Sequence, residues 1–582
     1  MLLHALLFPL FLIFFYCLGV SFVFFLSKIN NVKNRENTLV TGIGVRGFLG
    51  LLLFGMFGVA FHFFQPLTST AFRLSIFLLA LFGGIIFIKN RRQLSKIELC
   101  SFVAISCILA MLAASMRSGY DGGLYHLPHQ VWLRTEPIVV GLANLHGRFG
   151  FSSLYEYMGA ALWVKDNFIL LSYLQASFIL FFLLFLIEQS RNAEGAHQVL
   201  LLGVVANFIV FHDYIYEEKI DKDLALELWY TYTDLPAGIL FTVTFLYGHW
   251  IISQKSSVQG NEWSIFSLLL LAALLLKISS VPLVLWFLFV VLYRIVSKRD
   301  NPFPVLISLV LPTGFMLVWF LKNIISTGCL LYPLSSSCID VPWSAKINAL
   351  KDAQWITAWA RHPGSGLYSL QDNGWFLSWW YPHYYPFLIK LLLSGGVVGI
   401  LYVGIALRSK FASVKVLDIR FWGAVGVMAL SLLFWFWKAP TPRFGIGVFF
   451  LFFPVVFLFF SGYDFDLSVK ISKPIQVAVI VGLLFFSLYI GTPWKKISQQ
   501  NLFSFKAITV PTPKTQADVT YGVRVIGGDQ CWLSPQCSPY DRPPLSSWHG
   551  VKTFCNFNYY KSSQWGYKIP WKIKTIHSGY SP

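Results

Sequence analysis

Long apolar runs separated by shorter polar segments form the pattern of this chain from residue 2 to residue 489. A membrane-spanning helix needs about 20 mostly apolar residues, and most of these runs approach that length. The pattern therefore predicts an all-α polytopic membrane protein with about 14 transmembrane helices. The predicted helices are 2–26, 48–64, 72–88, 97–116, 168–187, 199–211, 235–250, 266–276, 281–293, 304–321, 387–406, 421–436, 446–460 and 475–489.

Basic residues fall mainly in short segments between these runs, which predicts the side of the membrane that each segment occupies. The clusters KNRRQLSK (89–96) and SKRD (297–300) are typical of cytoplasmic loops. Lys28 and Lys33 follow the first run and no Lys or Arg precedes it, so we expect an uncleaved first helix whose N-terminus lies outside. Counting spans from that start places three large loops on the outer face, at 117–167, 212–233 and 322–386.

The chain is expected to contain two domains. Residues 1–491 carry the transmembrane helices, and residues 492–582 form a polar tail with turn residues and short β-type runs. We therefore expect a small extracytoplasmic cap at the C-terminal end. Both termini are predicted to lie outside the cytoplasm.

Cysteine positions agree with this division. Two cysteines lie in the third outer loop and three lie in the tail, where disulfides persist outside the cytoplasm. The remaining three lie in apolar runs, where a thiol usually packs as a small apolar group. We expect one bridge between Cys329 and Cys338 and one within the C-terminal trio of Cys531, Cys537 and Cys555, with Cys531 and Cys537 as the candidate pair.

Composition supports a membrane protein and argues against binding to nucleic acid. The 582 residues are 56% hydrophobic and only 12% charged, with 56 phenylalanines. The formal net charge is +19, but the basic residues lie in loops between apolar runs, as the positive-inside rule produces. A basic surplus also suits a protein that handles phosphates at a membrane surface. The lipid bilayer is therefore a predicted partner, and nucleic acid is not.

The first outer loop carries the strongest candidate for chemistry, Asp121. This carboxylate lies just past a predicted helix end, between Tyr120 and Tyr125. A carboxylate at the membrane rim is desolvated enough to act as a general base and is still reachable by a polar acceptor. The alternative is a loop carboxylate that is solvated or that caps a helix running through Trp132.

Other polar residues of this loop are candidates for contact with a substrate. His126 and His129 are three residues apart and would share a helix face, so that with Asp121 they form a candidate metal site. The alternative is a pair of interfacial histidines that bond to backbone or to lipid phosphate. No metal is firmly predicted, and a divalent ion is left open as a cofactor. The full set of candidates for substrate contact is Tyr120, Tyr125, His126, His129, Asn144, His146 and Arg148.

Three further charged residues lie at predicted outer helix ends. Asp234 precedes a helix, where it is either a second acid near Asp121 or an N-cap. Lys277 lies within an apolar run, and Arg443 follows two prolines at a helix end. Either cation could bind the phosphate of a lipid donor, and Arg suits this role because its guanidinium binds phosphate through two nitrogens. The alternative for both is snorkelling to the membrane rim.

Several motifs together resemble a known class of membrane enzymes. They are YDGGLYHLPHQVWL, VVGLANLHGRFGFSSLYE, YTDLPAG, KISS, LKNIISTGCLLYP, APTPRFG and DQCWLSPQC. The chain is similar to a family of bacterial multi-pass proteins that resembles the GT-C superfamily of membrane glycosyltransferases.

This resemblance implies a sugar donor on a polyprenyl phosphate, bound at the non-cytoplasmic face of the bacterial inner membrane. It implies that Asp121 is the general base, that Asp234 is a second acid and that Arg443 and Lys277 bind the donor phosphate. Two positions depart from the pattern of the superfamily, namely Gly122 after the first acid and Thr441 before Pro442. The second departure excludes a metal-assisted site built on an acid at residue 441.

The predicted function is transfer of a sugar from a polyprenyl-phosphate donor to a glycan, lipid or protein acceptor in the cell envelope. One alternative is a polysaccharide polymerase or ligase. Another is a transporter or flippase of lipid-linked glycans, a class that tends to carry polar residues inside the membrane. We expect this chain to keep its polar groups in outer loops, and its two halves show no evident symmetry, which favours an enzyme.

Overall fold

The computed structural model describes most of the membrane domain and parts of the tail. The described residues are 2–30, 42–89, 96–113, 121–164, 168–192, 196–211, 233–362, 367, 370–371, 374–380, 385–408, 418–461 and 482, with 515–518, 522–525, 531, 533, 537–538, 545–548 and 551–554 in the tail.

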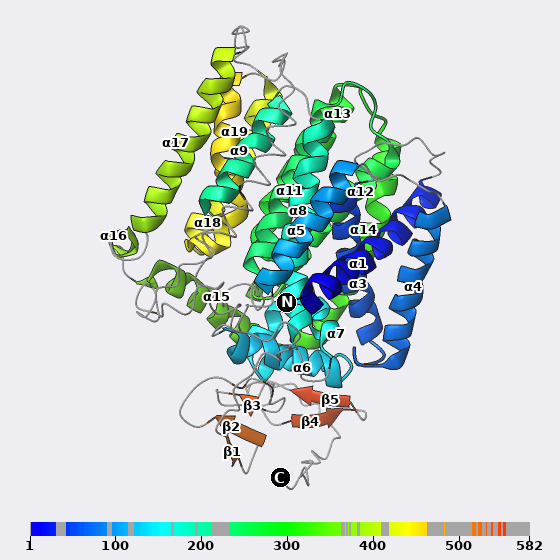
Figure 1. The fold of residues 1–582 in the computed structure, drawn as a ribbon. Coiled ribbons are helices and arrows are strands. Elements are labelled where there is room, and N and C mark those ends of the chain that lie inside the picture. The colour runs from blue at the N-terminus through cyan, green and yellow to red at the C-terminus, as the bar shows by residue number, and fades with distance from the viewer. Residues whose placement is uncertain are drawn as a thin grey trace.

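Apolar helices form a bundle that makes up most of the molecule (Figure 1). Among the described residues, eight helices are long and apolar enough to cross a membrane, and five shorter apolar helices accompany them. The long ones are α1 (Leu2–Ile29), α3 (Ile43–His62), α4 (Thr70–Lys89), α8 (Ile169–Asn192), α11 (Asp234–Ser253), α13 (Pro282–Val296, which reaches this length together with the preceding turn from Ile278), α14 (Pro302–Thr327) and α18 (Ile419–Lys438). The shorter ones are α5 (Lys96–Ala113), α9 (Ala196–Phe211), α12 (Gly260–Leu276), α17 (Tyr385–Arg408) and α19 (Ile446–Ser461).

These helices coincide with the predicted runs, apart from the run at 475–489. Of that run the structure describes only Gly482, so the expected total of about 14 spans stays a prediction. Several boundaries differ from expectation by up to six residues, and those of α12 and α14 have an identifiable cause. Helix α12 begins at Gly260 rather than at residue 266, because Gln259 and Glu262 form a capping box ahead of the apolar run.

Helix α14 continues beyond the expected end at residue 321, so Lys322 is not the first residue of an outer loop. Its side chain is buried, and its Nζ lies 3.9 Å from the centre of the Trp319 ring. The helix ends at Gly328, which adopts φ 71° in the left-handed region. The terminating signal is therefore the glycine and not the first charged residue.

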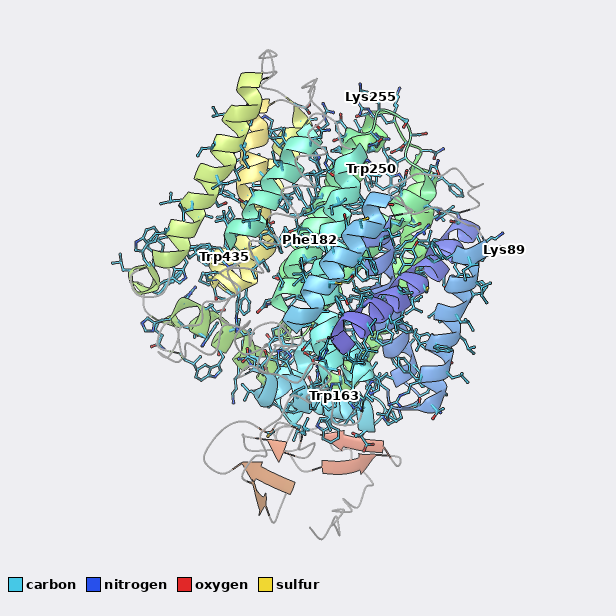
Figure 2. All side chains as sticks on the ribbon, in the orientation of Figure 1. Lys89, Trp163, Phe182, Trp250, Lys255 and Trp435 are labelled. Atoms are coloured by element: carbon cyan, nitrogen blue, oxygen red, sulfur yellow. A yellow bond between two sulfur atoms is a disulfide. The ribbon has the colours of Figure 1, made fainter. Side chains whose placement is uncertain are left out.

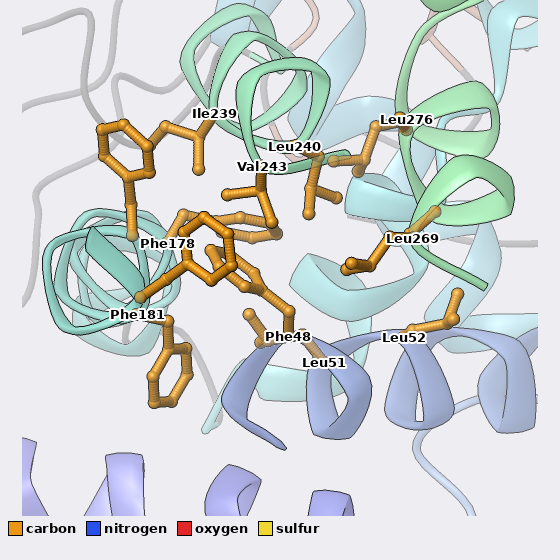
Figure 3. Packing of buried hydrophobic residues seen from close by; sticks show 14 of the residues in the cluster. Phe48, Leu51, Leu52, Phe178, Phe181, Ile239, Leu240, Val243, Leu269 and Leu276 are labelled. Atoms are coloured by element: carbon orange, nitrogen blue, oxygen red, sulfur yellow. The ribbon is translucent and has the colours of Figure 1, made fainter. Parts of the chain in front are cut away.

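The core lies where α3, α8, α11 and α12 meet, and Figure 3 shows side chains from all four helices pointing toward one another. Outer helices instead expose apolar stripes. On α4 the stripe repeats at helical spacing, with more than a third of each side chain exposed at Leu74, Phe77, Leu81, Ile85 and Ile88. Such faces fit contact with lipid, which agrees with a membrane protein.

One end of the bundle carries most of the additional structure, and we call it the loop end. It comprises η1 (Gly122–His126), α6 (Leu127–Thr135), η2 (Leu142–Asn144), η3 (Gly147–Phe151), α7 (Leu154–Leu162), η6 (Ser335–Ser337), α15 (Lys346–Arg361) and α16 (Trp375–Trp380) (Figure 1). Trp163 lies at this end in Figure 2, whereas Lys89 and Lys255 lie at the opposite end. The assignment of the two ends to outside and cytoplasm stays a prediction.

Short strands of the tail lie beyond the loop end (Figure 1). β1 (Thr515–Asp518) pairs antiparallel with β2 (Gly522–Val525), with Thr515 opposite Val525. β2 pairs in parallel with β3 (Cys537–Ser538). β4 (Leu545–Trp548) and β5 (Val551–Phe554) form an antiparallel pair, and β5 lies against η2. The extent and independence of the predicted cap, and the boundary at residue 491, stay predictions.

The expected bridge between Cys329 and Cys338 is confirmed. Cys531 is also disulfide-bonded. The side chain of Cys537 and all of Cys555 lie outside the described part of the chain, so the pairing within the trio stays a prediction.

Candidate functional site

Four charged residues that were singled out separately in the sequence meet at the loop end. Asp121, Asp234, Lys277 and Arg443 come from four separate segments, and we call them the charge cluster. Nη2 of Arg443 donates to Oδ2 of Asp121 at 3.5 Å, and Nε of Arg443 lies 3.6 Å from Oδ2 of Asp234. The Lys277 ammonium contacts Oδ1 of Asp234. The Arg443 guanidinium thus lies between two carboxylates.

The local backbone explains how the two acids reach this cluster. Asp121 occupies the N-cap position of η1 but makes no capping hydrogen bond with its side chain. Asp234 is the first residue of α11, whose N-cap is Thr233. The capping roles considered for both acids are therefore wrong, and both carboxylates are available to the cations.

The two cations come from helix ends. Lys277 is the C-cap of α12, where the chain turns into η5 (Ile278–Ser280). Arg443 lies in η8 (Pro442–Gly445), between α18 and α19. Neither cation only snorkels toward the rim, because both lie against carboxylates.

Aromatic rings enclose the cations of the charge cluster. Nζ of Lys277 lies 3.5 Å from the centre of the Phe444 ring, and Cζ of Arg443 lies 4.8 Å from that of Trp359 on α15. The exposed fractions of the four side chains run from 9% for Asp234 to 21% for Lys277, so the cluster is shielded but still reachable. Burial lowers the pKa of the Lys277 ammonium, although the Asp234 carboxylate opposes this shift.

A buried network lies directly behind Asp121, and it contains a carboxylate that the sequence analysis missed. Nδ1 of His126 contacts Oε1 of Glu156, and Nε2 of Gln130 donates to Oε2 of Glu156 at 2.8 Å. Nε1 of Trp163 donates to Oε1 of Gln130 at 2.8 Å. Glu156 follows Ser153 in an S-x-x-E pattern that is typical of a capping box, so its spacing alone indicates a cap. Its carboxylate instead locks α6 and η1 onto α7.

The candidate metal site of Asp121, His126 and His129 does not assemble. The described residues contain no group of three or more His, Cys, Asp or Glu side chains placed to hold a metal ion. His126 turns toward Glu156, and His129 stacks on Phe149 with 5.4 Å between ring centres. The π-helical turn of η1 ends at His126 and α6 begins at the next residue, and the two imidazoles face different partners.

His146 stacks on the same Phe149 ring, at 5.0 Å between centres. Burial lowers the pKa of His146 to about 3, and burial also holds the pKa of His129 well below its ordinary value. Both imidazoles are therefore neutral at neutral pH. Both side chains pack against Phe149 within the loop, and neither lies in the charge cluster.

The remaining candidates for substrate contact are Tyr120, Tyr125, Asn144 and Arg148. Nδ2 of Asn144 donates to the carbonyl oxygen of Trp343 at 2.8 Å, so this side chain ties η2 to the segment between α14 and α15. Arg148 faces Asp352 of α15, another carboxylate that the sequence analysis missed, and its guanidinium lies over the Tyr125 ring. Tyr120 lies outside the described residues.

Comparison with known proteins gives a family and no activity. Residues 1–450 match the family model described as "Domain of unknown function (DUF8201)". No curated protein and no solved structure matches the chain.

Proposed function

The chain belongs to the DUF8201 family, and we propose from its site that it is a membrane glycosyltransferase of the GT-C kind. It would transfer a sugar from a polyprenyl-phosphate donor to an acceptor hydroxyl at the loop end of the bundle. The observation that carries this proposal is the Arg443 guanidinium held between the carboxylates of Asp121 and Asp234. That arrangement provides a base and a phosphate-binding cation side by side.

The reaction uses these groups in complementary roles. The acceptor oxygen attacks the anomeric carbon, and the bond from that carbon to the phosphate oxygen breaks. The hydroxyl proton passes to the Asp121 carboxylate, and the electron pair of the broken bond leaves on the phosphate. Arg443 and Lys277 stabilise the negative charge that develops on the departing phosphate.

Charge balance links the two halves of this reaction. Two cations and two carboxylates give the charge cluster no net formal charge before transfer. When Asp121 accepts the proton, one negative charge next to Arg443 disappears. The cluster then carries a net positive charge at the moment when the phosphate leaves. Such a site binds the transition state more strongly than the ground state, which is what accelerates a reaction.

An apolar stripe beside the cluster suits a lipid carrier. It begins at Ile278, directly after Lys277, and continues along α13 at helical spacing. At least 40% of each side chain is exposed at Ile278, Val281, Leu285, Leu288, Leu292 and Val296. A polyprenyl chain could lie along this stripe in the bilayer while its phosphate reaches Lys277 and Arg443.

The site residues do not fit a divalent metal in this arrangement. Arg443 lies between Asp121 and Asp234, and Lys277 contacts Asp234. The two carboxylates that would bind the ion are thus already paired with cations. We derive no step through a metal.

A second candidate function, transport of a lipid-linked glycan, is favoured by polar side chains buried among the membrane helices. Nδ1 of His197 on α9 lies 2.9 Å from Nδ1 of His249 on α11, and Glu188 of α8 is buried as well. Polar groups are therefore not restricted to outer loops, contrary to the expectation from sequence. Product analysis separates the two functions, since transport moves the carrier and forms no glycosidic bond.

The test is a transfer assay with the purified protein in liposomes, using radiolabelled polyprenyl-phosphate sugars and an envelope lipid extract as acceptor. We expect Asp121→Asn to reduce transfer by at least about 100-fold, because general base catalysis typically contributes 10²–10⁴-fold. Asp340→Asn is the matched control, because Asp340 is an exposed carboxylate between α14 and α15. Wild-type rates in Asp121→Asn would refute the assignment of the base, and carrier movement without a new bond would favour transport.

A further inference from the structure

A second polar group lies close to the charge cluster, and the proposed reaction does not use it. It joins the first outer loop to α15. Nε of Arg148 lies 3.9 Å from Oδ1 of Asp352, and the hydroxyl of Tyr332 donates to Oδ2 of Asp352 at 2.6 Å. The Arg148 guanidinium lies over two rings, with Cζ 6.0 Å from the centre of Tyr125 and 5.6 Å from that of Phe151.

Two glycines permit this close approach. A Cβ at Gly147 would lie 2.3 Å from Oδ2 of Asp352, and a Cβ at Gly150 would lie 2.7 Å from the ring of Tyr332. A side chain at either position would force η3, the Asp352 carboxylate or the Tyr332 ring to shift. The GRFG sequence of the loop therefore serves to bring Arg148 and Asp352 together across two outer loops.

The pair has unused hydrogen-bonding capacity. The distance of 3.9 Å is too long for a hydrogen bond, and within the described ranges the Arg148 guanidinium donates none. Oδ1 of Asp352 likewise accepts none among these residues. The exposed fractions are 29% for the Arg148 side chain and 15% for that of Asp352. Nitrogen donors and a carboxylate oxygen thus face each other at a partly exposed position.

The chemistry of the pair selects a polyhydroxyl ligand over an anion. A hydroxyl group can donate to the carboxylate and accept from the guanidinium, so neighbouring hydroxyls of a sugar satisfy both groups. A phosphate or carboxylate would be repelled by Asp352. The adjacent rings of Tyr125 and Phe151 supply apolar surface, and small-molecule sites typically combine such surface with a few polar groups.

Tyr125 connects this group to the charge cluster. Asp121 and Tyr125 are four residues apart around one helical turn, which places them on the same face. Burial and then the Asp121 charge raise the pKa of the Tyr125 hydroxyl, whereas the charges of Arg148 and Arg443 oppose that shift, so all three lie within electrostatic reach of this hydroxyl. A ligand on the Arg148–Asp352 pair is therefore close to the proposed base.

The geometry points to an acceptor subsite: Arg148 and Asp352, with Tyr125 beside them, bind a sugar ring of the acceptor. That the bound sugar belongs to the acceptor rests on the proposed function. On that basis the acceptor is a glycan. Asp352 and Arg148 act by binding and take no part in bond breaking.

The test measures sugar binding without turnover. Methyl glucoside, methyl galactoside and methyl mannoside serve as probes in saturation-transfer NMR with the full-length protein in lipid nanodiscs. We expect at least one of them to bind the wild type, with about tenfold weaker binding to Asp352→Asn, since a neutral amide oxygen accepts a weaker hydrogen bond than a carboxylate does. The exposed control Asp340→Asn should bind like the wild type.

Two additions keep the result decisive. Arg148→Lys replaces a partly exposed side chain that donates no hydrogen bond in the described structure, so it reports on binding even if Asp352→Asn does not fold. Inorganic phosphate should not displace the glycoside. The subsite would be overturned if no glycoside binds the wild type or if phosphate displaces the glycoside. It would also be overturned if Asp352→Asn and Arg148→Lys both bind glycosides as tightly as the wild type does.

The transfer assay separates this proposal from the proposed function. In that assay we expect Asp352→Asn to raise the KM for acceptor about tenfold and to change kcat little. If no variant or wild type transfers a sugar but glycosides bind in a way that depends on Asp352, the enzymatic function fails and the sugar site stands. If Asp121→Asn is inactive while Asp352→Asn binds glycosides normally, only the subsite fails.

Discussion

Two groups of Arg and Asp side chains at different places in the bundle differ in burial and in the distances between their charged atoms. Arg294 and Asp300 are fully enclosed, with exposed side-chain fractions of 0% and 2%. They form two hydrogen bonds, from Nε to Oδ2 at 2.7 Å and from Nη2 to Oδ1 at 3.0 Å. Arg443 lies 3.5 Å from Asp121 and 3.6 Å from Asp234, and the exposed fraction of its side chain is 20%.

The remaining partners strengthen this contrast. Nη2 of Arg294 donates to the carbonyl oxygen of Ser256 at 2.6 Å, and the amide of Val258 donates to Oδ1 of Asp300 at 2.7 Å. Every part of that pair is occupied in holding two loops together. Arg443 lies farther from its two carboxylates than Arg294 lies from Asp300, and its side chain is partly exposed. The enclosed pair therefore fits a structural role, and the partly exposed group of several charges fits a binding role.

The largest expected effect is on stability and comes from the enclosed pair. Arg294→Gln leaves Asp300 buried without its cation, and breaking a buried ion pair typically costs about 3–5 kcal/mol. We expect a strong drop in melting temperature and in the yield of folded protein, measured by fluorescence-detected size-exclusion chromatography after heating. A melting temperature equal to that of the wild type would show that the enclosed pair is not structural.

The next effect is on activity and comes from the charge cluster. Arg443→Lys keeps a positive charge but loses the planar group that reaches Asp121 and Asp234 together. We expect transfer to fall by about 100-fold, the typical loss for one donor to a developing charge. Because partly exposed pairs contribute at most about 1 kcal/mol to stability, the melting temperature should change little. A large loss of stability with unchanged specific activity would reverse the contrast with Arg294.

The smallest effect tests how the loop at residues 121–164 is held, since the neutral imidazoles of His129 and His146 stack on Phe149 within it. His146 has a pKa of about 3 in the folded protein against about 6.5 when unfolded. Its contribution to stability is therefore complete above pH 6.5 and is lost progressively as the pH falls toward 3. The slope is at most about 1.4 kcal/mol for each pH unit.

His146→Asn isolates that contribution, because Asn does not titrate and can still accept a hydrogen bond from the backbone amide of Arg148, as Nδ1 of His146 does at 3.1 Å. We expect melting temperatures of the wild type to fall more steeply between pH 7 and pH 5 than those of the variant. Parallel pH profiles would show that His146 is not kept neutral by burial.

Local patterns in the sequence predicted much of the fold. Run length and apolar content located the eight long and five shorter apolar helices, but α7, α15 and α16 were not predicted. The position of both cysteines in one loop that was predicted to be extracytoplasmic led to the Cys329–Cys338 bridge. Boundaries were less predictable. A buried lysine such as Lys322 looks like a helix end when only its charge is considered, and the surroundings that shelter it come from distant segments.

The sequence by itself determined that apolar helices alternate with polar loops, and it drew attention to Asp121, Asp234, Lys277 and Arg443 as charges at helix ends. Only the tertiary structure decided that these four meet, since Asp121 and Arg443 are 322 residues apart. It also decided that His126 faces Glu156 and that Arg148 faces Asp352. The physical reason is that the hydrophobicity of a run is a local property, whereas the distance between two charges depends on how every helix between them packs.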